Sequence, residues 1–376
     1  MRRSENKILT THVGSLPHLD GMPEKTAGDD LRRAVKDVVA LQRDIGLDIV
    51  NEGEYTKGGD WLGYLEHRFS GFEEVPPAEG PPLIAQGRDR EAFAAFYAYA
   101  SQRGVLFYEP GHQIAQRRPT YACTGPIAFA GQEALRQEIE LFGAVASGEA
   151  FLTSTAPASI EVYRRNLYYK TEEEYLFALA DAMAVEYRAI VDAGFLLQVD
   201  DAWLPALWDR IGVAMGLEAF RKRCMVRVEA LNHALAGIPE DRIRYHLCWG
   251  SWHGPHAFDL ELVHLVDILL QVKAQAYLIE AANARHEHEH DVWSKGALPN
   301  RKILIPGVVT HSTDIIEHPE LVSQRILRFA AHVGKENVIA GTDCGFGGRS
   351  HPQIAWAKLR SLVEGAERAS KALRYA

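Results

Sequence analysis

Short apolar runs rich in β-branched residues alternate along the chain with longer segments of helical periodicity. Eight such runs are each followed by a break rich in Gly, Pro, Ser or Asp: 7–15, 47–54, 120–126, 195–203, 243–250, 276–283, 302–309 and 337–345. Between them, segments such as 172–194 and 321–334 repeat apolar residues at helical spacing and end on a glycine, which suits a helix C-terminus. The pattern predicts strands that alternate with helices and pair in parallel through right-handed crossovers.

Eight strand–helix units in a chain of 376 residues predict an α/β fold, a TIM-type (β/α)8 barrel. We expect one catalytic domain that covers residues 1–376. The spacing is irregular in one place, because about 65 residues separate the second and third runs. The Pro/Gly-rich piece 71–93 lies there, so we expect an insertion at about 55–118 that elaborates a loop over the barrel mouth.

Composition and charge narrow the classes of function. The net charge of -9 and the absence of a Lys/Arg cluster argue against a nucleic-acid partner. No stretch approaches the roughly 18 apolar residues of a membrane span, and the first fifteen residues lack the apolar run of a secretion signal. Four cysteines in so long a chain do not make a disulfide framework. We therefore expect a cytoplasmic protein with reduced thiols.

Polar side chains gather at the predicted carboxyl ends of the strands, which converge on one mouth in a barrel. They are His12, Ser15, Glu52, Glu54, Asp200, Asp201, His246, Cys248, Glu280, His311 and Cys344. His246 and Cys248 fall on the same face of one strand, because side chains repeat every second residue. Alone, this pair fits a packed cysteine beside a hydrogen-bonded histidine somewhat better than a metal site. Cys344 and Glu280, at matching strand ends, favour a metal site, and a His/Cys/Cys/carboxylate set favours Zn²⁺.

Three segments resemble the zinc-ligand segments of the cobalamin-independent methionine synthase superfamily: YHLCW (245–249), LIEAAN (278–283) and GTDCGFGGR (341–349). The resemblance extends to 10–17, 51–65 and 197–203, and so spans nearly the whole chain in the expected order. It implies a zinc ion that binds the thiol of homocysteine and activates it for alkylation.

The resemblance also implies roles for individual residues. Four match the metal ligands: His246, Cys248, Glu280 and Cys344. Four match positions that contact an amino-acid substrate, the first two at its backbone and the others at its amino group: Gly14, Ser15, Glu54 and Asp200. His311 resembles the family's histidine near the methyl donor, so His311 and Asp200 are the predicted catalytic residues.

The chain departs from the family in ways that leave the methyl donor open. The family's long members carry an additional N-terminal barrel that helps to bind a polyglutamylated folate, whereas this chain matches only the catalytic half. Asp201 stands where a glutamate is expected, and 71–118 is unlike the synthase core. A folate and a methylcorrinoid both remain candidate donors, and a homo-oligomer remains an option.

Three alternatives compete with a homocysteine methyltransferase. In the first, a coenzyme M-like thiol attacks an epoxide or other alkyl electrophile, and Arg349 would suit its sulfonate. A zinc hydrolase is a different class, against which thiolate-rich ligation argues. The third is a purely structural zinc site in a binding protein. Separately, ARHEHEHD (284–291) holds three alternating histidines and resembles a second metal-binding tract. We interpret it as a mouth loop, because it follows the Glu280 strand directly.

Overall fold

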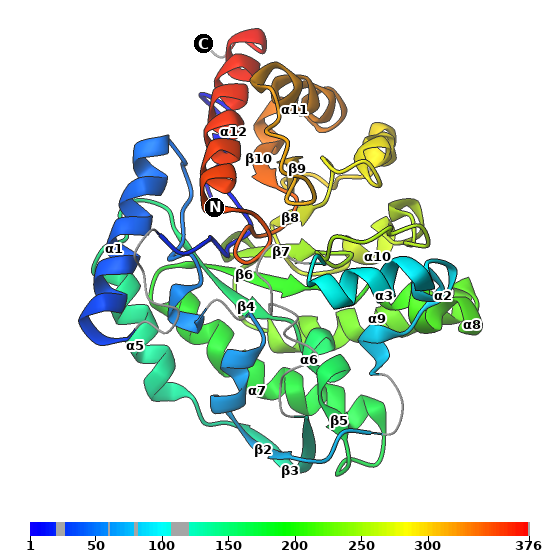
Figure 1. The fold of residues 1–376 in the computed structure, drawn as a ribbon. Coiled ribbons are helices and arrows are strands. Elements are labelled where there is room, and N and C mark those ends of the chain that lie inside the picture. The colour runs from blue at the N-terminus through cyan, green and yellow to red at the C-terminus, as the bar shows by residue number, and fades with distance from the viewer. Residues whose placement is uncertain (20–26, 59–60, 79–81, 107–119, 375–376) are drawn as a thin grey trace.

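A curled parallel sheet lies at the centre of the protein (Figure 1). The computed structural model describes residues 1–19, 27–58, 61–78, 82–106 and 120–374. Within these residues, seven strands pair in the order β1-β10-β9-β8-β7-β6-β4, and every neighbouring pair is parallel. The strands are β1 (Leu9–Thr10), β4 (Phe151–Thr155), β6 (Leu196–Asp201), β7 (Ile243–Leu247), β8 (Ala276–Ile279), β9 (Ile303–Val309) and β10 (Ile339–Thr342).

Residues 47–50 hydrogen-bond to both edges of this sheet. The Ile49 N–H donates to the carbonyl of Thr10, the last residue of β1, at 3.1 Å, and the Phe151 N–H of β4 donates to the Val50 carbonyl at 3.0 Å. Val50 also forms a parallel bridge with Ala150. The two edge strands therefore approach the same segment, which is how the sheet curls on itself.

Helices surround the outer face of the sheet (Figure 1). The longer ones are α1 (Gly28–Ile45), α5 (Gln132–Gly143), α7 (Glu172–Asp192), α9 (Leu217–Ala234), α11 (Pro319–Val333) and α12 (Pro352–Ala372). Short helices connect them: α6 (Pro157–Tyr163), η4 (Trp208–Gly212), α8 (Val213–Met215), η5 (Glu240–Arg242), η6 (Leu262–His264), α10 (Val266–Leu269), η7 (Glu287–Lys295) and η8 (Lys335–Asn337). The alternation of strand and helix confirms the predicted α/β organisation.

The predicted third strand, 120–126, lies in a different sheet, so that assignment was wrong. It falls in β3 (Tyr121–Phe129), which pairs with antiparallel β2 (Phe69–Glu74) and with parallel β5 (Arg165–Asn166). Its place in the parallel sheet belongs to β4, whose five residues FLTST are all buried. Because β4 has only five residues and ends in Ser and Thr, its apolar signal is weak, whereas β3 has nine residues.

The chain between the end of the first helix and β3 forms several small elements outside the parallel sheet. They are η1 (Tyr55–Lys57), η2 (Gly63–His67), β2, η3 (Leu83–Ala85), α2 (Arg88–Ala92) and α3 (Ala94–Arg103). The predicted insertion at 55–118 covers this region, and of it residues 59–60, 79–81 and 107–118 lie outside the described residues. Arg68 ties the region to α7 through an ion pair with Glu186 at 2.8 Å.

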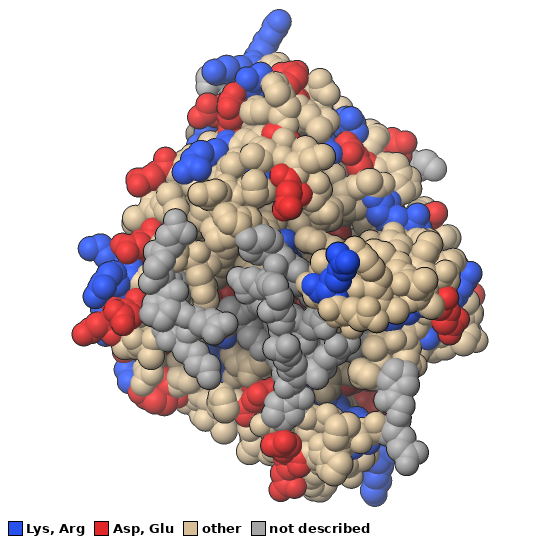
Figure 2. All heavy atoms as spheres, viewed as in Figure 1, with Lys and Arg blue, Asp and Glu red and all other residues tan. Residues whose placement is uncertain are grey.

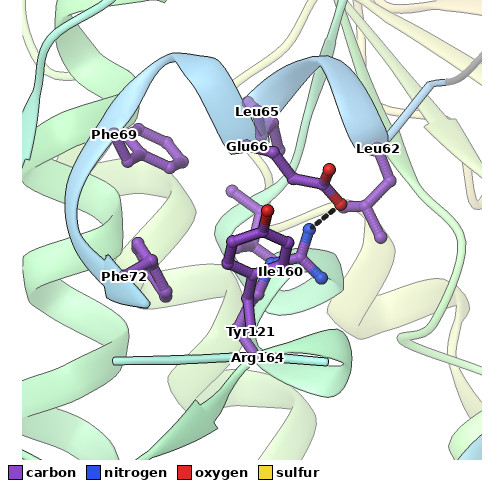
Figure 3. Close-up of a pocket in the computed structure, with 8 residues that line it drawn as sticks. All are labelled: Leu62, Leu65, Glu66, Phe69, Phe72, Tyr121, Ile160 and Arg164. Carbon is purple, nitrogen blue, oxygen red and sulfur yellow. Dashed lines mark hydrogen bonds and ion pairs between the residues drawn. The ribbon is translucent and has the colours of Figure 1, made fainter. Parts of the chain in front are cut away.

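A small pocket opens beside β2 (Figure 3). Mostly apolar side chains line it, and an ion pair between Glu66 and Arg164 at 3.1 Å closes one side. None of the predicted site residues belongs to its lining.

Two apolar cores flank the parallel sheet. A large one joins the sheet to the surrounding helices, and a small one fills the inside of the curl with residues such as Leu9, Ile49, Phe151 and Ile305. Charged side chains of both signs are interspersed around the rim of the face in Figure 2. Among the described residues, no helix combines the length and apolar character that crossing a membrane requires.

Candidate metal centre

Three potential metal ligands converge at the carboxyl ends of β7 and β10. His246 lies on β7, Cys248 directly follows that strand, and Cys344 follows β10; all three are buried. Their candidate ligand atoms all lie within 4.8 Å of one another, and the two sulfur atoms are 3.9 Å apart. Two sulfurs bound at about 2.3 Å to one tetrahedral zinc would lie about 3.8 Å apart. Because β8 and β9 separate these strands in the sheet, its curl brings the ligands together.

One ring nitrogen of His246 is hydrogen-bonded, and the other has no hydrogen-bond partner. Its Nδ1 lies 2.8 Å from Oδ1 of Asp200, the residue that faces it in the β6–β7 register. Since a carboxylate only accepts, Nδ1 carries the hydrogen, and Nε2 presents its lone pair when the ring is neutral. Nε2 is buried and has no hydrogen-bond partner. A buried polar atom needs a partner, and a metal ion would supply one here; the carboxylate on the other nitrogen is the usual support of a metal-bound histidine.

The pKa values of the two cysteines are shifted in opposite directions. Their mutual hydrogen bond lowers the pKa of Cys344 well below its usual value, and the positive charges of Arg349 and His246 act in the same direction. The same hydrogen bond, with burial, raises the pKa of Cys248. The opposite shifts favour ionisation of Cys344, and a thiolate is the form of cysteine that binds metals.

Glu280 lies beside this trio and is not one of the three converging residues. Its Oε1 accepts from the Trp249 N–H at 2.9 Å, and its Oε2 accepts from the Asn283 amide at 2.8 Å. Burial raises the pKa of Glu280 to about 7, an effect that His286 opposes and Asp343 and Cys344 reinforce. Its role as a fourth ligand stays a prediction.

The predicted substrate turn lies next to the metal ligands. The Ser15 carbonyl accepts from the Phe346 N–H at 2.8 Å, and the Ser15 hydroxyl accepts from Arg349 at 3.3 Å, so the turn is tied to the loop that carries Cys344. Gly14 has a φ of +148°, and a Cβ there would lie 2.8 Å from Oε1 of Glu54. Glycine therefore gives the Glu54 carboxylate room to reach the backbone of the turn.

Two buried glutamates follow residues 47–50. Burial raises the pKa of Glu54 to about 7; Lys57 opposes this and the charge of Asp200 adds to it. Burial likewise raises the pKa of Glu52 to about 8, against the effect of Lys57, and its Oε1 has no hydrogen-bond partner. Both carboxyls are thus poised to ionise when a cation approaches.

The other predicted polar residues differ in whether a side-chain atom is left without a hydrogen-bond partner. Asp201 accepts from the Tyr245 hydroxyl at 2.9 Å and the Ser159 hydroxyl at 3.0 Å, which is a structural role. His12 bonds Gln42 at 2.8 Å, and burial lowers its pKa to about 3. Burial, then the positive charges of Arg349 and His253, lowers the pKa of His311 well below its usual value. His311 Nδ1 has no partner, so this neutral imidazole keeps a free nitrogen.

Comparison with known proteins shows related chains of the same length. No family model matches the chain. An uncharacterized protein of Bacillus subtilis, YxjH, is 24% identical over 94% of this chain and 92% of its own. A methionine synthase of Saccharolobus islandicus is 24% identical over 95% of this chain and 93% of its own. The solved structure of a B12-independent methionine synthase from Shewanella sp. W3-18-1, in complex with selenomethionine, superposes with a TM-score of 0.72. It is 17% identical and covers 98% of this chain and 99% of that one.

Over nearly its whole length the chain is similar to proteins named methionine synthase, and it shares the fold of a B12-independent methionine synthase. The resemblance predicted from the three ligand segments is confirmed at this level. The match covers 92% or more of the length of each of these relatives.

Two loop regions contact the segment that carries Cys248. His286 of the 284–291 tract bonds Glu289 through Nδ1 at 2.9 Å and Asp259 through Nε2 at 3.2 Å. Its ring lies 4.4 Å from that of Trp249, which follows Cys248. Across the mouth, the Trp252 indole donates to the Tyr97 hydroxyl of α3 at 3.1 Å. The elaborated region therefore contacts the loop after β7.

Three supporting residues were missed in the sequence. The Gln198 amide donates to Oδ1 of Asp200 at 2.7 Å, and Arg244 fills the curl by donating to the His12 carbonyl at 2.8 Å. Asp343 accepts from the N–H groups of 281 and 282 at 2.7 and 2.8 Å, which joins the end of β10 to that of β8. Alternation would have found the first two, since each lies two positions before a predicted site residue on the same strand face.

Proposed function

We propose that the protein is a zinc-dependent alkyltransferase that activates a thiol substrate, with homocysteine as the favoured acceptor. One observation carries the proposal: the candidate ligand atoms of His246 and two cysteines lie within 4.8 Å of one another, and Nε2 of His246 has no hydrogen-bond partner while Asp200 holds the other ring nitrogen. The relatives named methionine synthase support thiol methylation as the reaction class.

In this proposal the protein supplies a soft, anionic binding site. Zinc, when bound, would deprotonate an incoming thiol and leave it nucleophilic. His246, Cys248 and Cys344 would hold the ion, and Asp200 would orient the His246 ring. Glu280 is proposed as the fourth ligand, which would require it to leave its present partners, Trp249 and Asn283. A ligand that can leave provides the opening a substrate thiol needs.

Recognition of an amino-acid substrate would fall to the turn and the buried carboxylates. Gly14 and Ser15 would contact its backbone, and Glu54 with Asp200 would accept hydrogen bonds from its ammonium group. An ammonium ion beside Glu54 would lower the raised pKa of that carboxyl and fix it as a carboxylate. Arg349, half-buried and hydrogen-bonded to Ser15, would face the substrate carboxylate.

The runner-up is a transferase that adds a coenzyme M-like thiol to an epoxide or another alkyl electrophile. The Arg349 guanidinium is the feature that favours it. Glu54 and Asp200 favour homocysteine instead, because two buried carboxylates beside the turn repel a sulfonate and attract an ammonium group. His311 would lie towards the methyl donor, for which a folate and a methylcorrinoid are both candidates.

We infer in addition that residues 47–50 take the eighth place in a closed β/α barrel, and that 1–376 is one catalytic domain with an insertion at about 55–118. The hydrogen bonds of residues 47–50 to both edges of the sheet support the first inference. The four free cysteines support a reducing location such as the cytoplasm.

Calorimetry on the zinc-loaded protein tests this proposal. Homocysteine should bind with release of the thiol proton, seen as a dependence of the heat on the ionisation enthalpy of the buffer. Methionine, which has no thiol, is the control and should release about one proton fewer than homocysteine, because ionisation of Glu54 is common to both ligands. Glu54→Gln should weaken homocysteine and leave coenzyme M unaffected. Binding without proton release, or equal proton release in Cys344→Ser, would contradict thiol activation at this site.

A further inference from the structure

A second group of potential ligands meets at the surface, outside the centre described above. His290 and Asp291 belong to η7 and His332 to α11, and their candidate ligand atoms also lie within 4.8 Å of one another. His290 Nδ1 is 3.2 Å from His332 Nε2. Asp291 Oδ1 is 3.2 Å from His290 Nδ1 and 4.0 Å from His332 Nε2. Three electron-pair donors thus face one small volume.

One shared proton cannot satisfy this arrangement when both rings are neutral. If His290 Nδ1 carries hydrogen, it donates either to Asp291 or to His332, and the other contact is left without a proton. If His332 Nε2 donates to His290, the His290 lone pair is used and its contact with the Asp291 carboxylate is repulsive. A single cation between the three atoms would satisfy all of them at once.

The spacing also suits a transition-metal ion. Two nitrogens bound at about 2.05 Å to one tetrahedral ion lie about 3.3 Å apart, close to the 3.2 Å found here. The two rings face each other with an interplanar angle of 13°, so a modest turn of each ring would direct both lone pairs at one ion. We propose that His290, Asp291 and His332 form a second, solvent-accessible site for Zn²⁺ or another imidazole-binding divalent ion.

Neighbouring contacts fix the two elements that carry these ligands. The Arg325 guanidinium of α11 donates hydrogen bonds to both carboxylate oxygens of Glu287 of η7, at 3.1 and 2.9 Å. Arg325 also donates to the Ala282 carbonyl at 3.0 Å, two residues after Glu280. The ligand-bearing segments are therefore held together before any ion arrives, which lowers the ordering cost of binding.

Exposure separates the second site from the buried centre. The side chains of His290 and His332 are 22% and 20% exposed, and that of Asp291 is 78% exposed. Water can complete the coordination of an ion there, and the site contains no sulfur. An ion would join η7 to α11 and stabilise the segment that follows β8. Its binding should therefore be weaker than that of the buried thiolate site and independent of it.

A zinc titration of protein that already holds one equivalent tests this second site. The wild type should bind one further equivalent in calorimetry, and its melting temperature should rise as that equivalent binds. His332→Ala and His290→Ala should each abolish the second equivalent and keep the first. Asp291→Asn should weaken the second equivalent at least tenfold.

His233→Ala is the matched control, because His233 forms a surface pair with Asp181 at 2.6 Å and is not part of a three-residue group among the described residues. This variant should bind the second equivalent as the wild type does. Uptake of one equivalent only by the wild type, or undiminished second uptake by both His332→Ala and His290→Ala, would overturn the proposal. Loss of the second equivalent in His233→Ala would do the same.

Discussion

Two buried histidines beside the same loop have opposite bonding states. His246 and His286 are each 3% exposed, and each contacts carboxylate oxygen. His246 bonds Asp200 through one nitrogen and leaves the other free, whereas both nitrogens of His286 are held, by Glu289 and Asp259. Burial and an acidic neighbour therefore do not identify a metal ligand. His246 is distinguished by an unpartnered nitrogen together with two cysteines whose sulfur atoms lie close to it.

Both rings have a raised pKa: burial lowers that of His246, but its hydrogen bond to Asp200 and the charge of that carboxylate raise it above the usual value. Burial alone would lower the pKa of His286, but its hydrogen bonds to Asp259 and Glu289 raise it to about 10. His286 is thus a cation at neutral pH that neutralises two buried carboxylates, and a protonated imidazole has no lone pair for a metal. His286 holds the mouth together, and His246 is available for chemistry.

Replacing each histidine in turn should give the largest difference, in bound zinc and in the free energy of unfolding. His246→Gln should lose most bound zinc, because it removes the only nitrogen in the trio, while His286→Gln should keep it. His286→Gln should instead lower the free energy of unfolding by about 3–5 kcal/mol, since it leaves buried carboxylates without their cation. Metal analysis and denaturant unfolding would measure the two effects. Equal zinc loss in both variants would erase the distinction.

A smaller difference in zinc affinity is expected between substitutions of two neighbouring carboxylates, Asp200 and Asp201. Asp200→Asn should lower zinc affinity by about 10–100-fold, because the amide can no longer fix His246 with its hydrogen on Nδ1. The neighbouring Asp201→Asn is the control, since Asp201 bonds Tyr245 and Ser159 instead. Competition with a chelator of known affinity would measure both. The comparison fails if Asp201→Asn weakens zinc as much as Asp200→Asn.

The smallest effect is a pH dependence of stability from His286. Its pKa is raised above the unfolded value of 6.5 to about 10 in the folded protein. Its contribution is therefore fully present below pH 6.5 and is lost as the pH rises through about 10. The unfolding free energy should fall across this interval by a few kcal/mol at most, and His286→Gln should flatten that part of the profile. An unchanged profile in the variant would show that His286 is not the titrating group.

The sequence predicted the parallel α/β organisation well, because apolar runs and glycine breaks recur wherever a strand passes to a helix. It failed for the third strand. Both 120–126 and FLTST can form strands, and only tertiary pairing decides which of them joins the parallel sheet. Local patterns contain no information on that choice.

The candidate site was partly predictable for the same reason. Alternation placed His246 and Cys248 on one face, and a common strand end suggested Cys344. The bond between Asp200 and His246 was not predictable, because it depends on the β6–β7 register. Nor could spacing show that Glu280 would be held by Trp249 and Asn283 beside the three converging ligands.

X-ray absorption at the zinc edge, on protein loaded with one equivalent, tests the thiolate centre most directly. We expect two sulfur neighbours at about 2.3 Å and at least one nitrogen neighbour at about 2.0 Å, with one sulfur lost in Cys344→Ser. The histidine–aspartate group at the surface cannot produce a sulfur signal. A spectrum with only nitrogen and oxygen neighbours, or one unchanged in Cys344→Ser, would contradict the central claim.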